Sequence, residues 1–168
     1  MKLRPYLFLL LAGLALSDIE VTMFYFEDQP ELRTLRTIPI AIDSLDNIWV
    51  GTWPTLEPGV DSIGGVYRYD GSSWDHWTIA STGGDLLDND IFDIEVAPDG
   101  KVWIATGFAA TLDTNTAVLY YFDYDDERWH RVGPEDGLPR WWYRDIEFDY
   151  EGNLWACDNK CYMSMFNG

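Results

Sequence analysis

Short apolar runs alternate with polar residues along most of this chain, and nearly every run contains an aromatic residue. Ile40 and Ile42 alternate with their neighbours, as residues on the two faces of a strand do. Ile94 and Val96 repeat that alternation further along. Pairs such as Asp70-Gly71 and Asp99-Gly100 separate the runs and are typical of hairpin turns. The pattern predicts an all-β chain of short antiparallel strands.

One stretch occurs three times. Residues 99–106 read Asp-Gly-Lys-Val-Trp-Ile-Ala-Thr, and related stretches lie at 46–52 and 151–156. Their tryptophans are Trp49, Trp103 and Trp155, which are 54 and 52 residues apart. Because they recur at the same strand position, we expect all three in the core. A repeat of about fifty residues with four antiparallel strands predicts the blade of a β-propeller.

The repeats divide the chain into five segments. We expect a signal peptide at 1–17, N-terminal strands at 18–37 that complete a blade elsewhere, blades at 38–90 and 91–142, and a truncated blade at 143–168. Each blade buries its faces only against its neighbours, so an incomplete ring of about two and a half blades leaves open edges. We therefore expect an N-terminal fragment of a longer protein that supplies the missing blades. Self-association into a ring is the alternative.

The net charge argues against nucleic-acid partners, and the N-terminal segment indicates the cellular compartment. The chain has 29 acidic and 11 basic residues and a formal net charge of −18, which disfavours nucleic-acid binding. Lys2 and Arg4 precede an apolar run at 6–16, which is too short to span a bilayer comfortably but suits a signal peptide cleaved after Ser17. A short uncleaved anchor is the alternative. The sequence predicts a periplasmic or secreted protein.

Two cysteines, Cys157 and Cys161, lie close together near the C-terminal end. Export permits a disulfide, provided that the Cα atoms come within about 7 Å. Two free thiols are the alternative, and a metal site would need further ligands. We predict no metal and no cofactor.

Two segments of the first repeat carry a family resemblance. Residues 47–52 (Asn-Ile-Trp-Val-Gly-Thr) and 65–71 (Gly-Val-Tyr-Arg-Tyr-Asp-Gly) resemble the two-component regulator propeller repeat. Gly137-Leu138-Pro139 resembles that family's entry to the next blade. Kelch repeats are of similar length, and Gly64-Gly65 fits them, whereas Ala117-Val118 does not. The resemblance implies the periplasmic sensor region of a membrane-tethered hybrid histidine kinase, which often responds to carbohydrate-derived signals.

Strand direction predicts where a ligand binds. Since strands alternate in direction within a blade, the long segments 53–63, 107–116 and 137–142 emerge on one face and the tight turns on the other. Functional residues concentrate on such loops, and flat aromatic side chains stack on sugar rings. The aromatic candidates for a small-molecule or carbohydrate-derived ligand are Trp53, Phe108, Trp141 and Trp142. Packing between blades is the alternative role for each.

We expect no catalytic residues in this chain. His76 and His130 occupy different repeat positions and have no evident nucleophile beside them. Four aspartates crowd one loop without the spacing of an EF-hand calcium site. They are Asp85, Asp88, Asp90 and Asp93. We predict a non-catalytic ligand-sensing propeller. The alternatives are an exported propeller enzyme of the streptogramin-lyase type and a secreted propeller that contacts other proteins.

Overall fold

The computed structural model describes residues 35–54, 64–107, 119–138, 143–158 and 163–167. These residues belong to the second of two compact units, 34–168. The expected signal peptide at 1–17 and most of the N-terminal strand segment lie outside the described residues. No helix in the described part of the chain is long and apolar enough to cross a membrane.

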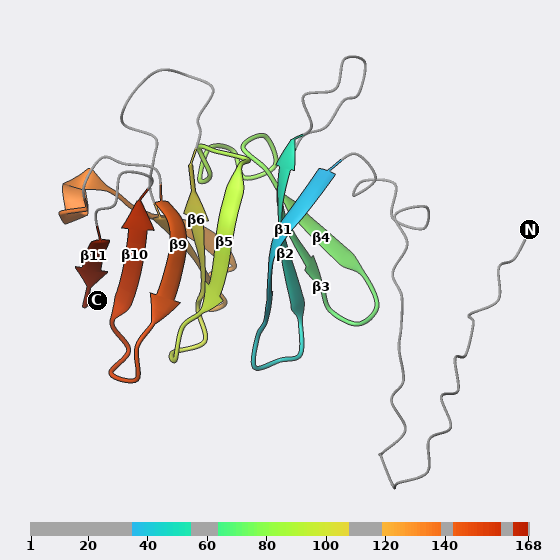
Figure 1. The fold of residues 1–168 in the computed structure, drawn as a ribbon. Coiled ribbons are helices and arrows are strands. Elements are labelled where there is room, and N and C mark those ends of the chain that lie inside the picture. The colour runs from blue at the N-terminus through green and yellow to red at the C-terminus, as the bar shows by residue number, and fades with distance from the viewer. Residues whose placement is uncertain (1–34, 55–63, 108–118, 139–142, 159–162, 168) are drawn as a thin grey trace, which may run out of the picture. The chain divides into compact units, whose positions relative to one another are not determined.

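In the described residues, eleven strands form three antiparallel sheets, so the predicted all-β class is confirmed (Figure 1). Blade 1 contains β1(Leu35–Ile42), β2(Ile48–Pro54), β3(Gly65–Tyr69) and β4(Trp74–Trp77). Blade 2 contains β5(Ile91–Val96), β6(Val102–Thr106), β7(Leu119–Asp123) and β8(Arg128–Val132). Blade 3 contains β9(Tyr143–Phe148), β10(Leu154–Asp158) and β11(Met163–Phe166), and a 3-10 turn, η2(Pro134–Asp136), precedes it.

The strand order within the sheets is the one predicted for a propeller blade. In each blade, consecutive strands pair as antiparallel neighbours, which is the predicted blade topology. The first strand begins earlier than expected: Leu35, assigned from the sequence to the N-terminal strands, opens β1 and pairs with Pro54. The ring is open within the described residues, as predicted.

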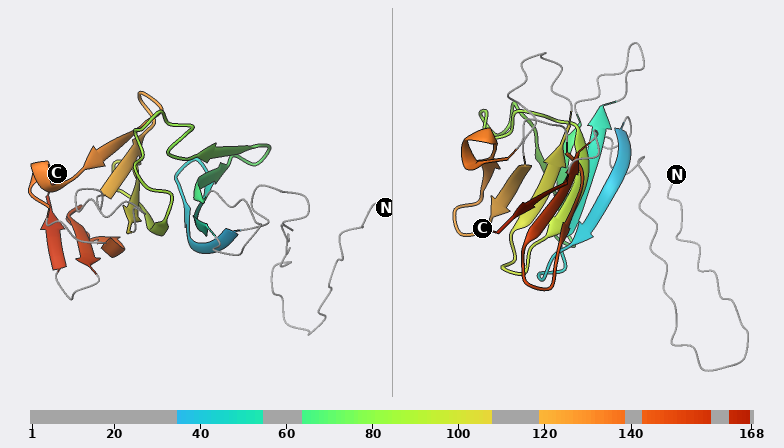
Figure 2. Two further views of the ribbon diagram at one scale, coloured as in Figure 1. Left: turned by 90° about the horizontal axis from the view of Figure 1, so that it is seen from above. Right: turned by 60° about the vertical axis from the view of Figure 1, so that its left-hand side comes forward.

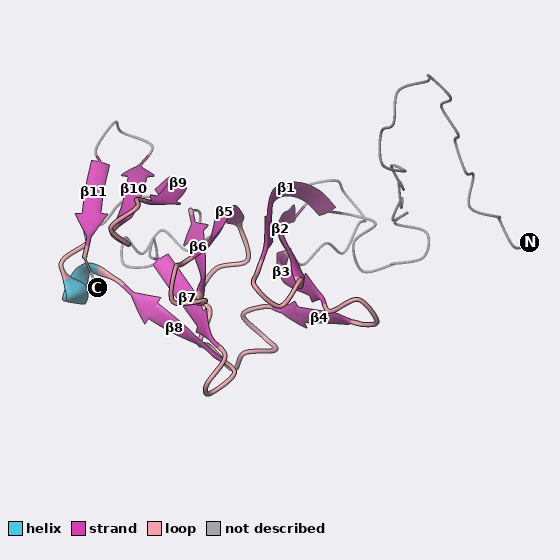
Figure 3. Ribbon diagram, turned by 90° about the horizontal axis from the view of Figure 1, so that it is seen from below, coloured by secondary structure: helices cyan, strands magenta, loops and turns pink. Residues whose placement is uncertain are grey.

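The apolar core lies between the blades. Strands β1, β5 and β9 are the inner strands and lie side by side, while the other strands extend outward from them (Figures 2 and 3). One buried cluster joins blade 1 to blade 2, with Trp49, Ile94 and Phe122 among its members. A second joins blade 2 to blade 3, with Trp103 and Ile146 among its members. The described blades therefore bury their apolar faces against one another, as a propeller requires.

The turn between the first two strands of each blade has the same backbone bonds. In blade 1, Asp43 N–H donates to the carbonyl of Asn47 (3.1 Å), and the equivalent bonds in blades 2 and 3 measure 2.8 and 3.0 Å. A left-handed residue is needed inside the turn, and blades 2 and 3 place Gly100 and Gly152 there. Blade 1 uses Asp46 at φ 61°, a conformation that aspartate tolerates better than most residues.

An aspartate in this turn fixes the recurring tryptophan of blades 1 and 3. The Asp43 carboxylate accepts the indole N–H of Trp49 at 2.8 Å, and Asp149 accepts that of Trp155 at 2.9 Å. Blade 2 has Ala97 at this position. The tryptophans are not equally buried: Trp49 and Trp103 are in the core, as predicted, whereas Trp155 is only partly buried. Trp155 differs because no blade covers its side of blade 3 in the described structure.

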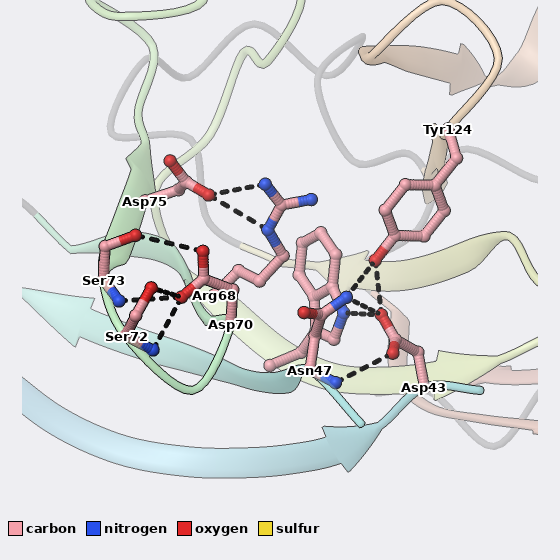
Figure 4. Close-up of polar contacts among 9 residues, drawn as sticks. Asp43, Asn47, Arg68, Asp70, Ser72, Ser73, Asp75 and Tyr124 are labelled. Atoms are coloured by element: carbon pink, nitrogen blue, oxygen red, sulfur yellow. Dashed lines mark hydrogen bonds and ion pairs between the residues drawn. The ribbon is translucent and has the colours of Figure 1, made fainter. Parts of the chain in front are cut away.

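Blades 1 and 2 are further joined by a polar and aromatic cluster (Figure 4). Tyr124, in the β7–β8 turn, donates its hydroxyl to Asp43 and accepts from Asn47 at 3.0 Å. The Arg68 guanidinium bonds Asp75 at 2.6 Å and lies 5.5 Å from the Trp49 ring centroid. Cation–π contact and a paired charge allow arginine to be held among aromatic rings. This cluster stabilises the scaffold at the turn end of the blades.

Candidate ligand-binding site

The loop-bearing end of the described fold is the end from which segments 55–63, 108–118, 139–142 and 159–162 depart. Strands β2, β6 and β10 run toward it, and β3, β5, β7 and β9 start from it. The tight turns lie at the opposite ends of the same strands (Figure 1). The predicted division of loops and turns between two ends is therefore what the strand topology shows.

Trp53 is the one predicted site residue that the structure describes. It is half-buried near the end of β2, and its indole N–H donates to the carbonyl of Ile91 at 2.9 Å. Its ring meets the Phe92 ring edge-on, with centroids 4.4 Å apart. Trp53 thus packs between blades 1 and 2. This is the role that the sequence analysis gave as the alternative to ligand binding. Its role toward a ligand stays a prediction.

The other predicted site residues, Phe108, Trp141 and Trp142, lie outside the described residues. Their chain neighbours are described, however. Gly107 packs closely against the ring of Phe92. A Cβ atom added at Gly107 would lie 1.8 Å from the nearest carbon of that ring. Tyr143, which follows Trp142, is buried at the start of β9. The three predicted aromatics are therefore attached to strand ends that lie at the loop-bearing end.

Phe92 and Arg144 lie in line with Trp53, and the sequence analysis named neither as a candidate. The Arg144 guanidinium carbon lies 4.1 Å from the centroid of the Phe92 ring. Phe92 precedes Ile94 by two residues and Arg144 precedes Ile146 by two, so they hold one repeat position on β5 and β9. A change from Phe to Arg at a fixed repeat position is the signal that could have identified them. The rings of Trp53 and Phe92 and the guanidinium of Arg144 form a continuous row across three blades.

Arg144 differs from the other described basic side chains. Those of Arg68, Lys101, Arg128 and Arg131 each lie within 4.0 Å of a carboxylate. Among the residues that the structure describes, Arg144 has no such carboxylate, and its contact is the ring of Phe92. A guanidinium stacked on a ring keeps its N–H groups in its own plane available to oxygen acceptors. The site can therefore offer aromatic faces together with a planar hydrogen-bond donor.

Several carboxylates lie close in sequence to Phe92 and Arg144, on β5, on β9 and in the segment before β5. Burial raises the pKa of Asp90. Burial, with the neighbouring Asp145, also raises the pKa of Asp93, although the N–H groups of Ile146 and Ile94 donate to it. Asp88 is buried and accepts the N–H of Asp90 at 3.0 Å. Asp85 forms an ion pair with Arg128. The four aspartates that lie close together in the sequence at 85–93 therefore make different contacts.

The two histidines lie apart. The His76 ring stacks on Tyr67 with centroids 3.9 Å apart, and its Nε2 lies 2.8 Å from the carbonyl oxygen of Gly64. His130 is on β8, with Nε2 2.9 Å from Asp126. Within the described ranges, no group of three or more histidine, cysteine or acidic side chains is placed to hold a metal ion. Cys157 is half-buried on β10, and Cys161 lies outside the described residues, so their pairing stays a prediction.

Comparisons with known proteins agree with this fold. The sequence model of the family described as "two component regulator propeller" matches residues 85–108, which include β5 and β6. The match falls on the second repeat, whereas the segments 47–52 and 65–71, which resemble the same family, lie in the first repeat. A search of curated proteins finds no match to the sequence.

Solved structures of similar fold come from bacterial sensors and an enzyme. The extracellular domain of the hybrid two component system BT4673 from B. thetaiotaomicron is 18% identical, with a TM-score of 0.52, over 78% of this chain and 16% of that chain. The corresponding domain of BT3049 is 17% identical (TM-score 0.41; 78% and 21% covered). Virginiamycin B lyase from Staphylococcus aureus is 9% identical (TM-score 0.49; 79% and 41% covered).

The match to BT4673 concerns the fold alone. This chain spans less than half the length of each of the three proteins. The family model adds information that the fold alone does not supply, because it matches sequence within a blade. The described part of this chain is built of propeller blades, and blade 2 matches the repeat described as two component regulator propeller over residues 85–108.

Proposed function

We propose that this chain is an extracytoplasmic, non-catalytic ligand-binding part of a two-component sensor. The family-model match on residues 85–108 and the export signal predicted at 1–17 support this role. The ligand is a small molecule or a carbohydrate-derived compound that binds at the loop-bearing end.

The observation that carries the proposal is the row of Trp53, Phe92 and Arg144 across three blades. Aromatic faces give large contact areas to sugar rings, and the guanidinium supplies donors for hydroxyl or carboxylate oxygens. Phe108, Trp141 and Trp142 remain the further candidates for stacking on the ligand, because each lies within three residues of a described strand end in the sequence. A rigid sheet holds each strand end, so the site is positioned before the ligand arrives.

Binding can be measured by calorimetry against a panel of neutral, amino and acidic oligosaccharides. Replacing Trp141 or Trp142 with alanine removes a stacking face, so we expect about tenfold weaker binding for each change. Trp53→Phe keeps an aromatic ring but removes the indole donor to Ile91. Its circular dichroism spectrum and melting temperature show whether a loss of binding comes from a disturbed scaffold.

Tyr150→Ala is the matched control. Tyr150 is a fully exposed aromatic in the β9–β10 turn, at the end opposite the proposed site. We expect this change to leave binding unaltered. Unchanged affinity in both the Trp141 and Trp142 variants, or a loss in the Tyr150 variant, would contradict the proposed site.

A further inference from the structure

Phe92 and Arg144 each occupy a β-bulge at the loop-bearing end of an inner strand. The register between β5 and β6 shifts at Phe92, which has no register partner on β6. The register between β9 and β10 shifts in the same way at Arg144. Bulges re-aim a side chain relative to the ordinary alternation of a strand and are common beside functional sites. Here two successive bulges bring a guanidinium and an aromatic ring into contact, 4.1 Å from guanidinium carbon to ring centroid.

The Phe92 ring is itself held in place. The Trp53 ring meets it edge-on, with centroids 4.4 Å apart. Gly107 packs so closely against it that an added Cβ atom would lie 1.8 Å from a ring carbon. A guanidinium that is stacked on a fixed ring is already oriented, so it loses little freedom when it binds an acceptor. Arg144 is exposed to solvent and is therefore both positioned and accessible.

The described carboxylates near Arg144 in the sequence do not neutralise its charge. The Asp93 carboxylate accepts the backbone N–H of Ile146 at 2.7 Å. Burial, with Asp145, raises the pKa of Asp93, and burial raises the pKa of Asp90. A guanidinium held beside either carboxylate would lower that pKa instead. Within the described residues, Arg144 thus keeps a positive charge that no ion pair satisfies.

We propose that Arg144 binds a carboxylate of the ligand, and that the ligand is an oligosaccharide containing uronic acid. This inference rests on the proposed function and narrows it to one class of saccharide. The edge of a guanidinium presents paired N–H donors that match the two oxygens of a carboxylate. The neighbouring Trp53 ring provides apolar surface for the sugar ring. In a chain of net charge −18, an acidic ligand needs a local cation of this kind.

Calorimetry with matched probes tests the proposal. The probes are oligosaccharides of galacturonate, glucuronate and mannuronate, each paired with the same oligosaccharide after its carboxylates are reduced to alcohols. At least one acidic probe should bind about tenfold more tightly than its reduced counterpart, because charge-assisted hydrogen bonds are lost on reduction. Binding of every reduced probe as tightly as its acidic counterpart would overturn the proposal.

Substitutions assign the preference to Arg144. Arg144→Gln removes the charge and should abolish the preference for the acidic probe. Arg144→Lys keeps the charge without the planar fork and should retain only part of the preference. Circular dichroism and the melting temperature check that each variant is folded. An unchanged preference in Arg144→Gln would overturn the assignment.

Arg128→Gln is the matched control, because it removes the same charge elsewhere. Arg128 begins β8, after the tight β7–β8 turn, and pairs with Asp85 at 2.8 Å. It therefore lies at the end of the strands opposite the site, and its loss should leave the preference intact. An equal loss in Arg128→Gln and Arg144→Gln would show that net charge, and not a contact at Arg144, causes the preference.

Salt gives an independent measurement. Dissolved ions screen an exposed ion pair, so the affinity for the acidic probe should fall more steeply with sodium chloride in the unaltered chain than in Arg144→Gln. Equal salt dependence in the two chains would contradict an ion pair at Arg144.

The outcomes separate this inference from the proposed function. A neutral oligosaccharide whose binding is weakened by Trp141→Ala but not by Arg144→Gln would leave the saccharide site standing and exclude the carboxylate. A sulfated neutral oligosaccharide that binds as tightly as the uronates would overturn the choice of carboxylate. An absence of binding by every probe would contradict both the saccharide site and this inference.

Discussion

At the scale of single residues, one carboxylate organises the contact between blades 1 and 2. Asp43 is buried and accepts hydrogen bonds from Trp49, Asn47 and Tyr124. Burial alone would raise its pKa, but these bonds outweigh burial and leave the pKa below its usual value. Asp43 therefore stays ionised at neutral pH and holds the Trp49 ring in a fixed orientation.

Replacing Asp43 with alanine should lower the free energy of unfolding by about 2 kcal/mol or more, because the buried donors of Trp49 and Asn47 lose their acceptor. Urea denaturation followed by tryptophan fluorescence measures this loss. The control is Asp46→Gly in the same turn, which introduces the residue that blades 2 and 3 use. The control should be neutral or stabilising. A similar loss in both variants would show that turn geometry, and not the Asp43 bonds, is responsible.

At the scale of the strands, β5 and β9 bring acidic side chains close together between blades 2 and 3. Burial, then Glu147, Asp93 and Asp145, raise the pKa of Glu95. The ionised forms of these carboxylates are thus penalised in the folded state. Asp149, in the β9–β10 turn, behaves oppositely: the N–H groups of Trp155 and Asn153 lower its pKa to about 2.

These opposing shifts predict the pH dependence of stability. A carboxyl whose pKa is raised on folding takes up protons more readily when folded, so Asp93 and Glu95 should raise stability as the pH falls from 7 toward about 4.5. Asp43 and Asp149, whose pKa values are lowered, should reduce stability as the pH falls further, below about 4. We therefore expect the melting temperature to be highest in mildly acidic solution.

Melting temperatures followed by circular dichroism between pH 3 and 8 test this expectation. Glu95→Gln removes one of the penalised charges, so it should raise the melting temperature at pH 7 and flatten the rise toward acid. Glu127→Gln is a suitable control, since Glu127 is exposed in the β7–β8 turn. A profile that falls steadily from pH 7 would contradict the proposed repulsion between β5 and β9.

At the scale of the whole described unit, the three blades are not equally protected. Blade 2 packs against blade 1 through the cluster around Trp49 and against blade 3 through the cluster around Trp103. Blades 1 and 3 each pack against one blade in the described structure. In repeat proteins, the free energy of unfolding is close to the sum of the contributions of each repeat and of each interface between repeats. Blade 2 has two such interfaces, so its local unfolding should cost the most free energy.

Amide hydrogen exchange should therefore be slowest in β6 and β7 of blade 2. Faster exchange in blade 2 than in blade 1 would contradict the packing described here.

Much of this architecture can be read from the sequence alone, since it follows from local patterns. Alternation of apolar and polar residues predicts the strands, and Gly100 and Gly152 predict the turns because few residues adopt a left-handed conformation. The period of the tryptophans predicts the blade. The division into a loop-bearing end and a turn end then follows from strand direction alone.

The aspartate of the turn could also have been read from the sequence, although it was not. Asp43 and Asp149 each precede an asparagine by four residues and the tryptophan by six, in two of the three repeats. Their effect is local, which is why spacing within one repeat reveals it. Ala97 in the remaining repeat obscures the pattern.

Contacts between blades required the tertiary structure. Tyr124 reaches Asp43 across 81 residues, and Trp53 reaches Ile91 across 38. No short-range pattern encodes which side chains meet at such separations, because the pairing depends on how two sheets pack. The row of Trp53, Phe92 and Arg144 emerges only when the strands are placed side by side.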